Sequence, residues 1–312
     1  MTLPKVLMTD VIRSTQQGDS HGGAYLIDLE SRSHEQVLDW NRVEINWEGR
    51  GMGRGLRGIC FVGDEIYIAA SDELFVFDRA WNLVRSYKNK FLHHCHEISF
   101  DGERYIYMTS TSFDSVLRFD VQTESYDKGW WFGVGKFGVG AKEYDPNGKV
   151  GPPHSDTLHI NQVFVDDGGI YISALRLGIM WTLKLDSGQV GQHAKIPVKT
   201  HNCQPIDSGL LVMNSTGDDC IVVADRRGKV LERFVYPLYE ESAMSHTNLG
   251  KDYARQGFGR GLCVDADTGL VIAGSSPGTV SAFDRGLGEM VASVNVSMDI
   301  RNAPHGLEVW PW

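Results

Sequence analysis

Residues 58–89, GICFVGDEIYIAASDELFVFDRAWNLVRSYKN, contain four short runs rich in Val, Ile, Tyr and Phe, separated by Gly, Asp, Asn and Ser. Runs of this length and composition, ending at turn-forming residues, are the signature of β-strands joined by tight turns. We therefore expect a four-stranded antiparallel sheet over this stretch. Such a sheet cannot bury both of its faces alone, so it needs neighbours of the same kind.

The same unit recurs along the chain. Further copies begin near Glu97, His159, Thr200 and Gly259, and the third run of each copy ends in an aspartate followed by a turn: FDRA, FDVQ, LDSG, ADRR and FDRG. Repetition of one small β-unit is typical of propellers, whose sheets stack radially. An open sandwich with a coincidental repeat is the alternative.

The two ends of the chain complete a sixth unit. Residues 303–310, APHGLEVW, look like a first strand with nothing after it, and PKVLMTDV, GGAYLIDLE and HEQVLDW look like strands two to four with nothing before them. We predict an all-β, six-bladed β-propeller of four-stranded blades, forming one domain over residues 1–312. Pairing of Leu307–Trp310 with the N-terminal strands closes the last blade and removes its open edges.

Two insertions lengthen the spacing between blades. Residues 128–153 are rich in glycine and are expected to form a loop, whereas residues 237–258 are expected to hold a short helix. Both precede a first strand, so we expect them on the face where the central channel opens. Long loops in a compact domain are more often functional than accidental.

Composition excludes several classes of partner. The net charge of -10 disfavours binding to nucleic acid, and no local Lys/Arg cluster offsets it. No apolar stretch approaches the roughly 18–20 residues that cross a bilayer. The start of the chain has no basic and apolar signal segment, so we expect a cytoplasmic protein without a membrane partner. The five cysteines lack CxxC spacing and are expected to be small buried residues. The oligomeric state is left open.

Histidines gather at the beginnings of the first strands. His96, His201 and His305 come from alternate blades, at nearly equal separations of 105 and 104 residues. Three converging imidazoles suit a divalent metal with an open position for substrate, which is the arrangement of catalytic sites. Zinc is the first candidate, iron the second, and calcium is less favoured. The alternative is that these polar residues satisfy backbone groups at a crowded channel mouth.

Other residues at or near these positions complete the expected site. His159 is a candidate fourth ligand, and Glu97 and Asn161 could orient ligands from a second layer or hold a metal-bound water. Arg57, Arg260 and Glu97 are the candidate catalytic residues. Arg57 and Arg260 could clamp a carboxylate, phosphate or sulfate, so we expect a small anionic substrate. Asn161, Asn202 and His94 are candidate substrate-binding residues. His201 falls one residue before its equivalents, and such a slip turns a strand side chain to the other face.

With these blades the chain resembles the six-bladed propellers that include the NHL-repeat proteins and the SMP-30/gluconolactonase-like proteins. The histidine layout is similar to that of peptidylglycine amidating lyase, which has an axial zinc on three histidines from alternate blades and catalytic arginines nearby. This resemblance implies that His96, His201 and His305 bind zinc and that Arg57 or Arg260 has the arginine role. The gluconolactonase type implies a calcium site, for which Asn161 and Asn202 are suitably placed.

The leading hypothesis is a metal-dependent lyase or hydrolase acting on a small anionic molecule at the channel mouth. A non-haem iron oxygenase with four histidines, His159 being the fourth, is a second hypothesis. A non-catalytic propeller that binds a ligand or a protein is the third.

Overall fold

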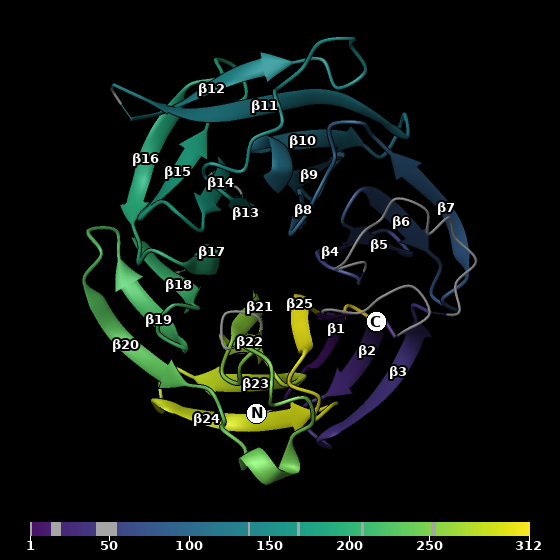
Figure 1. Cartoon of the computed structure of the whole chain (residues 1–312), viewed down its shortest axis with the longest axis vertical. Helices are drawn as coiled ribbons and strands as arrows, with labels where there is room; N and C mark the ends of the chain where they lie inside the picture. The colour runs from purple at the N-terminus through teal and green to yellow at the C-terminus, as the bar shows by residue number, and fades with distance from the viewer. Residues whose placement is uncertain are drawn as a thin grey trace. The chain divides into compact units, whose positions relative to one another are not determined.

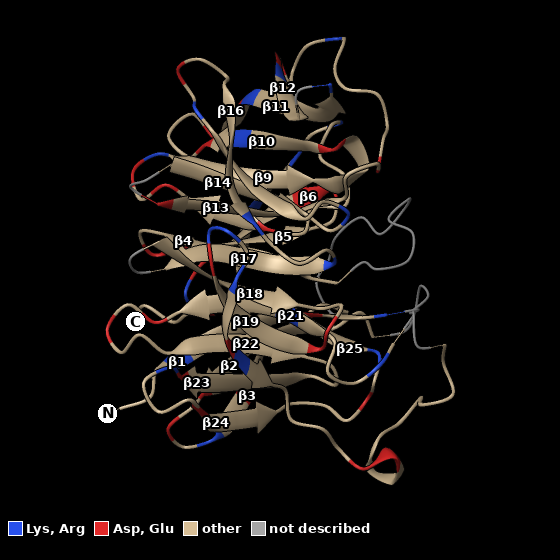
Figure 2. Cartoon of the chain, turned by 90° about the vertical axis from the view of Figure 1, so that its left-hand side faces the viewer, with Lys and Arg blue, Asp and Glu red and all other residues tan. Residues whose placement is uncertain are grey.

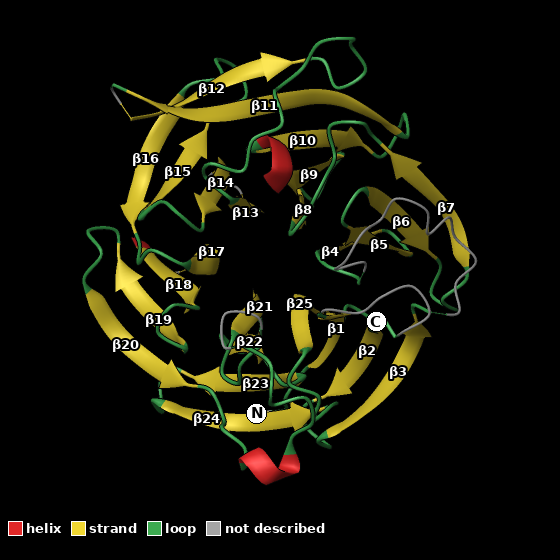
Figure 3. Ribbon diagram, in the orientation of Figure 1, coloured by secondary structure: helices red, strands yellow, loops and turns green. Residues whose placement is uncertain are grey.

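The computed structural model describes residues 2–13, 20–41, 55–136, 138–166, 169–206, 209–250 and 254–312. The regular secondary structure of this part of the chain is almost entirely β-strand, with short 3-10 helices η1 (Thr111–Phe113) and η3 (Glu241–Ala243) (Figure 3). Within the described ranges, no helix has the length and apolar character needed to span a bilayer.

The strands form six antiparallel sheets of four or five strands, so the predicted all-β class and six-bladed β-propeller fold are confirmed. The sheets are labelled in Figure 1. The first sheet has the order β25-β1-β2-β3 and contains β25 (Asn302–Val309), β1 (Lys5–Ile12), β2 (Gly23–Asp28) and β3 (Ser33–Asp39). The second contains β4 (Ile59–Val62), β5 (Glu65–Ala70), β6 (Glu73–Phe77) and β7 (Leu83–Lys88).

The third sheet has the order β12-β11-β10-β9-β8, from β8 (Ile98–Phe100), β9 (Tyr105–Ser110), β10 (Ser115–Asp120), β11 (Ser125–Gly135) and β12 (Gly138–Tyr144). The fourth contains β13 (Ile160–Asp166), β14 (Gly169–Ala174), β15 (Ile179–Leu183) and β16 (Val190–Lys195). The fifth contains β17 (Thr200–Ile206), β18 (Leu210–Ser215), β19 (Cys220–Asp225) and β20 (Val230–Val235). The sixth contains β21 (Gly259–Val264), β22 (Val271–Ser275), β23 (Thr279–Asp284) and β24 (Glu289–Asn295).

The chain divides into two compact units, and the fifth sheet contributes residues to both. The first unit comprises Met1–Arg57, Val212–Val223 and Val230–Trp312, and the second comprises Gly58–Leu211 and Ala224–Lys229. The expectation of one domain over residues 1–312 stays a prediction.

The closure of the blade formed by the chain ends is as the sequence predicts. Strand β25 pairs with β1 in antiparallel register, with Met8 opposite Leu307 and Val6 opposite Val309. The yellow β25 lies beside the purple β1 in Figure 1. Leu307 is buried in a core cluster with Val6, Met8 and residues of the β21–β24 sheet. Residues from opposite ends of the chain therefore share one sheet and one apolar cluster.

The repeated aspartate at the end of the third strand makes the turn that follows it. Asp78 Oδ1 accepts hydrogen bonds from the backbone N–H groups of Ala80 and Asn82, each at 2.9 Å. Asp225 Oδ1 accepts from the N–H groups of Arg227 and Lys229 in the same way, also at 2.9 Å. An aspartate that binds the backbone a few residues ahead stabilises a tight turn. This shared local chemistry explains why the repeat is visible in the sequence.

The inner strands carry the core, and the outermost strands meet solvent. Every residue of β6 is buried, whereas β7 beside it is mostly exposed. Figure 2 shows strands that are mostly free of charge, with Lys, Arg, Asp and Glu concentrated in the turns. All five cysteines are buried, as expected of small core residues, and none forms a disulfide.

The expectation that residues 128–153 form a loop is wrong for residues 128–135 and 138–144, which lie in strands. Strand β11 runs to Gly135, and β12 pairs with it as a fifth strand, with Trp130 opposite Glu143 and Val134 opposite Val139. Gly129 permits this pairing, because a Cβ there would lie 2.4 Å from Cζ of Tyr144. The other insertion, residues 237–258, does hold the short helix η3, and its residues 251–253 lie outside the described ranges.

Candidate functional site

Four of the predicted site histidines lie together in the second unit. His96 is at the centre: its ring centroid lies 5.3 Å from that of His159, 5.7 Å from that of His94 and 6.4 Å from that of His201. His96 and His201 are buried, with exposed fractions of 8% and 5%. The ring centroid of His94 lies 6.1 Å from that of His93. We call His94, His96, His159 and His201 the histidine cluster.

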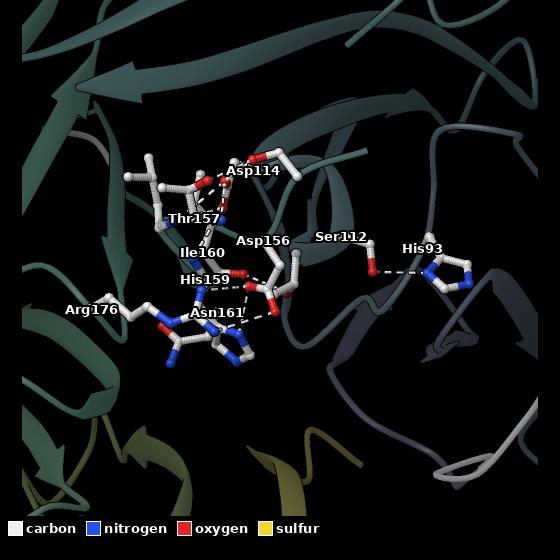
Figure 4. A network of polar contacts seen from close by, with 12 residues as sticks. His93, Ser112, Asp114, Asp156, Thr157, His159, Ile160, Asn161 and Arg176 are labelled. Carbon is white, nitrogen blue, oxygen red and sulfur yellow. Dashed lines mark hydrogen bonds and ion pairs between the residues drawn. The ribbon is translucent and has the colours of Figure 1, made fainter. Parts of the chain in front are cut away.

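The loop that carries His159 is held by one buried carboxylate. Asp114, at the C-terminal end of η1, accepts hydrogen bonds from the backbone N–H groups of Thr157 (2.7 Å), Leu158 (3.0 Å) and His159 (3.0 Å). Figure 4 shows these bonds converging on Asp114. His159 has φ of +60°, a left-handed conformation that non-glycine residues adopt only when their surroundings impose it. Asp114 supplies that constraint.

His159 also forms a pair with an acidic residue. Its Nδ1 lies 2.8 Å from Oδ1 of Asp156, and Arg176 Nη1 lies 3.3 Å from the same oxygen (Figure 4). A carboxylate that accepts the Nδ1 proton fixes the tautomer of the ring and leaves the lone pair on Nε2. An imidazole held in this way can act as a base or as a metal ligand.

Three buried side chains of the same unit form a polar network. Asn202 Nδ2 donates to Glu97 Oε2 at 2.8 Å and to Gln162 Oε1 at 3.0 Å, and all three side chains are buried. Neighbouring residues of a strand point to opposite sides, so Asn202 and His201 on β17 use different sides. The one-residue offset of His201 therefore separates two roles: Asn202 binds Glu97, and His201 contacts the ring of His96.

Asn161 lies at a bulge in β13, where the register with β14 shifts between Ile160 and Gln162. Its Nδ2 donates to the carbonyl oxygen of Thr200 at 3.2 Å. Its Oδ1 is buried and accepts no hydrogen bond from the described residues. Bulges re-aim side chains and are frequent beside active sites, and a buried acceptor without a donor is costly. Asn161 is therefore suited to receive a ligand or a water molecule.

The remaining predicted residues lie in the first unit. Arg260 Nη1 lies 2.7 Å from His305 Nε2, and His305 Nδ1 lies 3.0 Å from the carbonyl oxygen of Ala303. Burial, together with the charges of Arg260 and Arg57, holds the pKa of His305 well below its usual value. The imidazole is therefore neutral, donating from Nδ1 and accepting at Nε2 from the arginine. Its meeting with His96 and His201 stays a prediction.

Imidazole nitrogens are good metal ligands, but the described side chains are not arranged around a common metal position. Among the residues that the structure describes, no group of three or more His, Cys, Asp or Glu side chains is placed to hold a metal ion. The three rings around His96 are neighbours, but their donor atoms do not form such a group. At His305, the Nε2 lone pair accepts from a guanidinium, which would repel a cation at the same atom. The zinc, iron and calcium sites expected from the sequence stay predictions.

Sequence reasoning missed two residues of this site. Asp156 precedes His159 by three residues in HSDTLHIN, and this spacing was a usable signal for an Asp–His pair. Asp114 gave no signal, because it lies 45 residues before His159 and meets it only through the fold. A cavity of about 360 Å³ in the same unit is lined by residues that include Trp131, Tyr144 and Pro152, and none of its lining residues belongs to the histidine cluster.

Comparison with known proteins supports the fold alone. No family model matches the chain, and no curated protein matches it in sequence. Among solved structures, the chain is similar to one in a nidogen/laminin complex, with a TM-score of 0.61, 10% identity, and coverage of 98% of this chain and 97% of that one. It is also similar to virginiamycin B lyase from Staphylococcus aureus, with a TM-score of 0.48, 12% identity, and coverage of 78% of this chain and 70% of that one. At these identities the likeness shows the propeller fold alone.

Proposed function

We propose that the protein is an enzyme, a lyase or a hydrolase, that acts on a small anionic molecule, with its catalytic centre at the histidine cluster. One observation carries this proposal: Asp156 holds Nδ1 of His159 at 2.8 Å, and the ring of His159 lies against the buried His96. A carboxylate–imidazole pair beside a second imidazole provides a base and an acid within one site.

The chemistry follows from the tautomer of His159. With its Nδ1 proton donated to Asp156, the ring accepts a proton at Nε2, either from a water molecule that attacks the substrate or from a carbon of the substrate itself. The Asp156 carboxylate stabilises the imidazolium that forms. His96 lies close enough to supply a proton to the leaving group, directly or through one water molecule. Asn161 Oδ1, buried and without a donor, is available to accept a hydrogen bond from the substrate.

A resident metal is a separate proposal. Imidazole nitrogens suit zinc first and iron second, and the Asp156–His159 bond is of the kind that orients metal ligands. When bound, such an ion would lower the pKa of a water molecule and polarise a substrate oxygen. The described side chains do not form a complete ligand set, so the acid–base roles above do not depend on it. Elemental analysis of protein purified without added metal tests this proposal.

Turnover of a panel of anionic compounds tests the enzyme proposal. The panel contains p-nitrophenyl phosphate and p-nitrophenyl sulfate for hydrolysis, and malate and other 2-hydroxy acids for elimination, detected by absorbance of the unsaturated product. We expect the wild-type protein to convert at least one compound. His159→Ala should convert that compound about 100-fold more slowly, since general base catalysis typically contributes 10²–10⁴-fold. Asp156→Asn should give an intermediate loss.

The matched control is His193→Ala. His193 is a partly buried histidine of β16 in the same unit, and its ring packs on Tyr171 rather than on the histidine cluster. It should leave turnover unchanged. Equal rates for the wild-type protein and His159→Ala, with both proteins folded, would contradict the proposed catalytic centre.

A further inference from the structure

Four arginines of the first unit gather around one aromatic ring and one histidine. The guanidinium carbons of Arg13, Arg255 and Arg260 lie 4.4, 4.6 and 4.9 Å from the centroid of the Phe258 ring. Arg57, which is 4% exposed, and Arg13 and Arg255 all act electrostatically on Arg260. We call Arg13, Arg57, Arg255 and Arg260 the arginine cluster. Cation–π contacts with one ring offset only part of the repulsion among so many like charges.

Counter-charge is distributed unevenly over this cluster. Arg255 forms an ion pair with Asp219 at 2.5 Å and donates to the carbonyl oxygen of Thr216 at 2.6 Å. Arg260 makes one hydrogen bond among the described residues, to the neutral imidazole of His305. Burial and the three neighbouring arginines hold the pKa of Arg260 well below its usual value. A half-buried cation without a counter-ion is unfavourable, so Arg260 is the place where an anion would be most favourable.

The hydrogen bond from Arg260 to His305 also determines which edge of the guanidinium is left to face a ligand. His305 accepts from Nη1, and its own Nδ1–H is held by Ala303, so this contact fixes the orientation of the guanidinium plane. Arg260 Nε is buried and has no hydrogen-bond partner among the described residues. The Nε–Nη2 edge of a guanidinium presents two parallel N–H groups, which match two oxygens of a carboxylate, phosphate or sulfate.

We propose that Arg260 is the centre of an oxyanion-binding site in the first unit, with His305 positioning its guanidinium and Arg13 and Arg57 supplying further positive charge. The ligand is an oxyanion, either a tetrahedral phosphate or sulfate or a planar carboxylate, alone or as part of a small molecule. This inference goes beyond the proposed function, because it concerns residues of the first unit, whereas the histidine cluster belongs to the second. It also changes the expected role of His305 from a metal ligand to a positioning residue.

The positive charge of the arginine cluster contrasts with the net negative charge of the whole chain. The formal net charge is -10, so the average field of the protein repels anions. A local concentration of guanidinium groups therefore gives selective attraction at one place. A purely structural arginine would instead be expected to have a carboxylate partner, as Arg255 has in Asp219.

Thermal unfolding and isothermal titration calorimetry with simple anions test the site. Sodium sulfate, phosphate, acetate and malonate are each compared with sodium chloride at matched ionic strength, since surface charge screening is then equal. We expect at least one oxyanion to bind saturably and to raise the melting temperature more than chloride does. Tighter binding of sulfate or phosphate assigns a tetrahedral ligand, and tighter binding of acetate or malonate assigns a carboxylate.

Variants connect the binding to Arg260. Arg260→Gln should weaken oxyanion binding at least tenfold. Arg260→Lys keeps the positive charge but loses the two parallel N–H groups of the guanidinium, so it should also weaken binding. Arg79→Gln is the matched control, because Arg79 is an exposed arginine that pairs only loosely with Asp64, at 3.6 Å. If Arg260→Gln does not fold, the ¹⁵N–¹H signal of the arginine Nε–H groups in the wild-type protein supplies the measurement, and one such signal should move on titration with the bound anion.

The outcome separates this site from the proposed catalysis. His159→Ala should retain oxyanion affinity even if it abolishes turnover, and anion binding is measurable when no substrate in the panel is converted. The oxyanion site is overturned if no oxyanion binds more tightly than chloride, or if Arg260→Gln retains wild-type affinity.

Discussion

Asp10 joins three strands of the blade that closes the chain. Its side chain is 0% exposed, Oδ1 accepts from the backbone N–H of Gly23 on β2 at 2.6 Å, and Oδ2 accepts from Asn302 Nδ2 on β25 at 2.5 Å. Burial raises the pKa of Asp10 to about 7, against the lowering effect of these two hydrogen bonds. Asp10 is therefore expected to hold a proton in the folded protein at a pH where the unfolded chain has lost it.

The sign and size of the pH dependence follow from this difference. Because the folded-state pKa is the higher one, the contribution to stability is complete below about pH 4 and is lost as the pH rises through about 7. A shift of about 3 pKa units corresponds to about 4 kcal/mol at most. Between pH 5 and pH 8 the same pKa values give a loss of roughly 2.7 kcal/mol in the free energy of unfolding.

Asp10→Asn isolates this contribution, because an amide is neutral at every pH in this range. Asn302 Oδ1 is buried and has no partner among the described residues, so rotation of its amide lets it accept from the new NH₂ group. Urea unfolding followed by tryptophan fluorescence gives the free energy of unfolding of both proteins at pH 5, 6, 7 and 8. We expect the wild-type value minus the variant value to fall by roughly 2.7 kcal/mol from pH 5 to pH 8. Other titrating groups cancel in this difference.

A difference that stays constant from pH 5 to pH 8 would refute the reasoning. It would mean that the two hydrogen bonds keep the Asp10 carboxylate ionised in spite of its burial.

Four further predictions concern the loop, the closure, the arginine cluster and the metal. Asp114→Ala leaves three backbone N–H groups, including that of the buried Leu158, without their acceptor and should cost roughly 1–3 kcal/mol, with faster hydrogen exchange at His159; unchanged exchange would contradict its role in holding the loop. Leu307→Ala creates a cavity in the cluster between β25 and its neighbours and should lower the free energy of unfolding by about 2–5 kcal/mol in urea, whereas a loss below about 1 kcal/mol would mean that β25 adds little to the core. Arg260→Met removes a half-buried charge that three neighbouring arginines repel and should raise the melting temperature of the protein in chloride, and a lower value would indicate a counter-charge that compensates Arg260. If zinc binds at the histidine cluster, elemental analysis should find about one zinc per chain that is lost on His96→Ala, and its absence from the wild-type protein would exclude a resident zinc.

The strands and their closure could be predicted because their signals are local. Residues 58–89 show four apolar runs with turn residues between them, and β4 to β7 occupy those runs. The pairing of β25 with β1 followed from two incomplete halves of one repeat. The fifth strand, β12, was missed because glycines in residues 133–140 suggested a loop, while the hydrogen-bonding capacity of their backbone does not depend on side chains.

The histidine cluster could be predicted in part. His96, His159 and His201 were singled out by their position at the beginnings of equivalent strands. In the structure the ring centroids of His159 and His201 lie within 6.4 Å of that of His96. The partners that give these rings their chemistry were not predicted. Asp156 and Asp114 reach His159 through a turn and a neighbouring blade, and no repeat marks them.

The sequence by itself determined the repeating blade, the turns made by aspartate and the closure of the chain ends, because alternation of apolar residues and turn propensity act over a few residues. Only the tertiary structure decided what each polar side chain contacts. His305 accepts from Arg260, Asn202 donates to Glu97 and Arg13 stacks on Phe258, all between residues more than 40 positions apart. Such contacts depend on distances and angles between strands of different blades, which a pattern with a period of two residues does not encode.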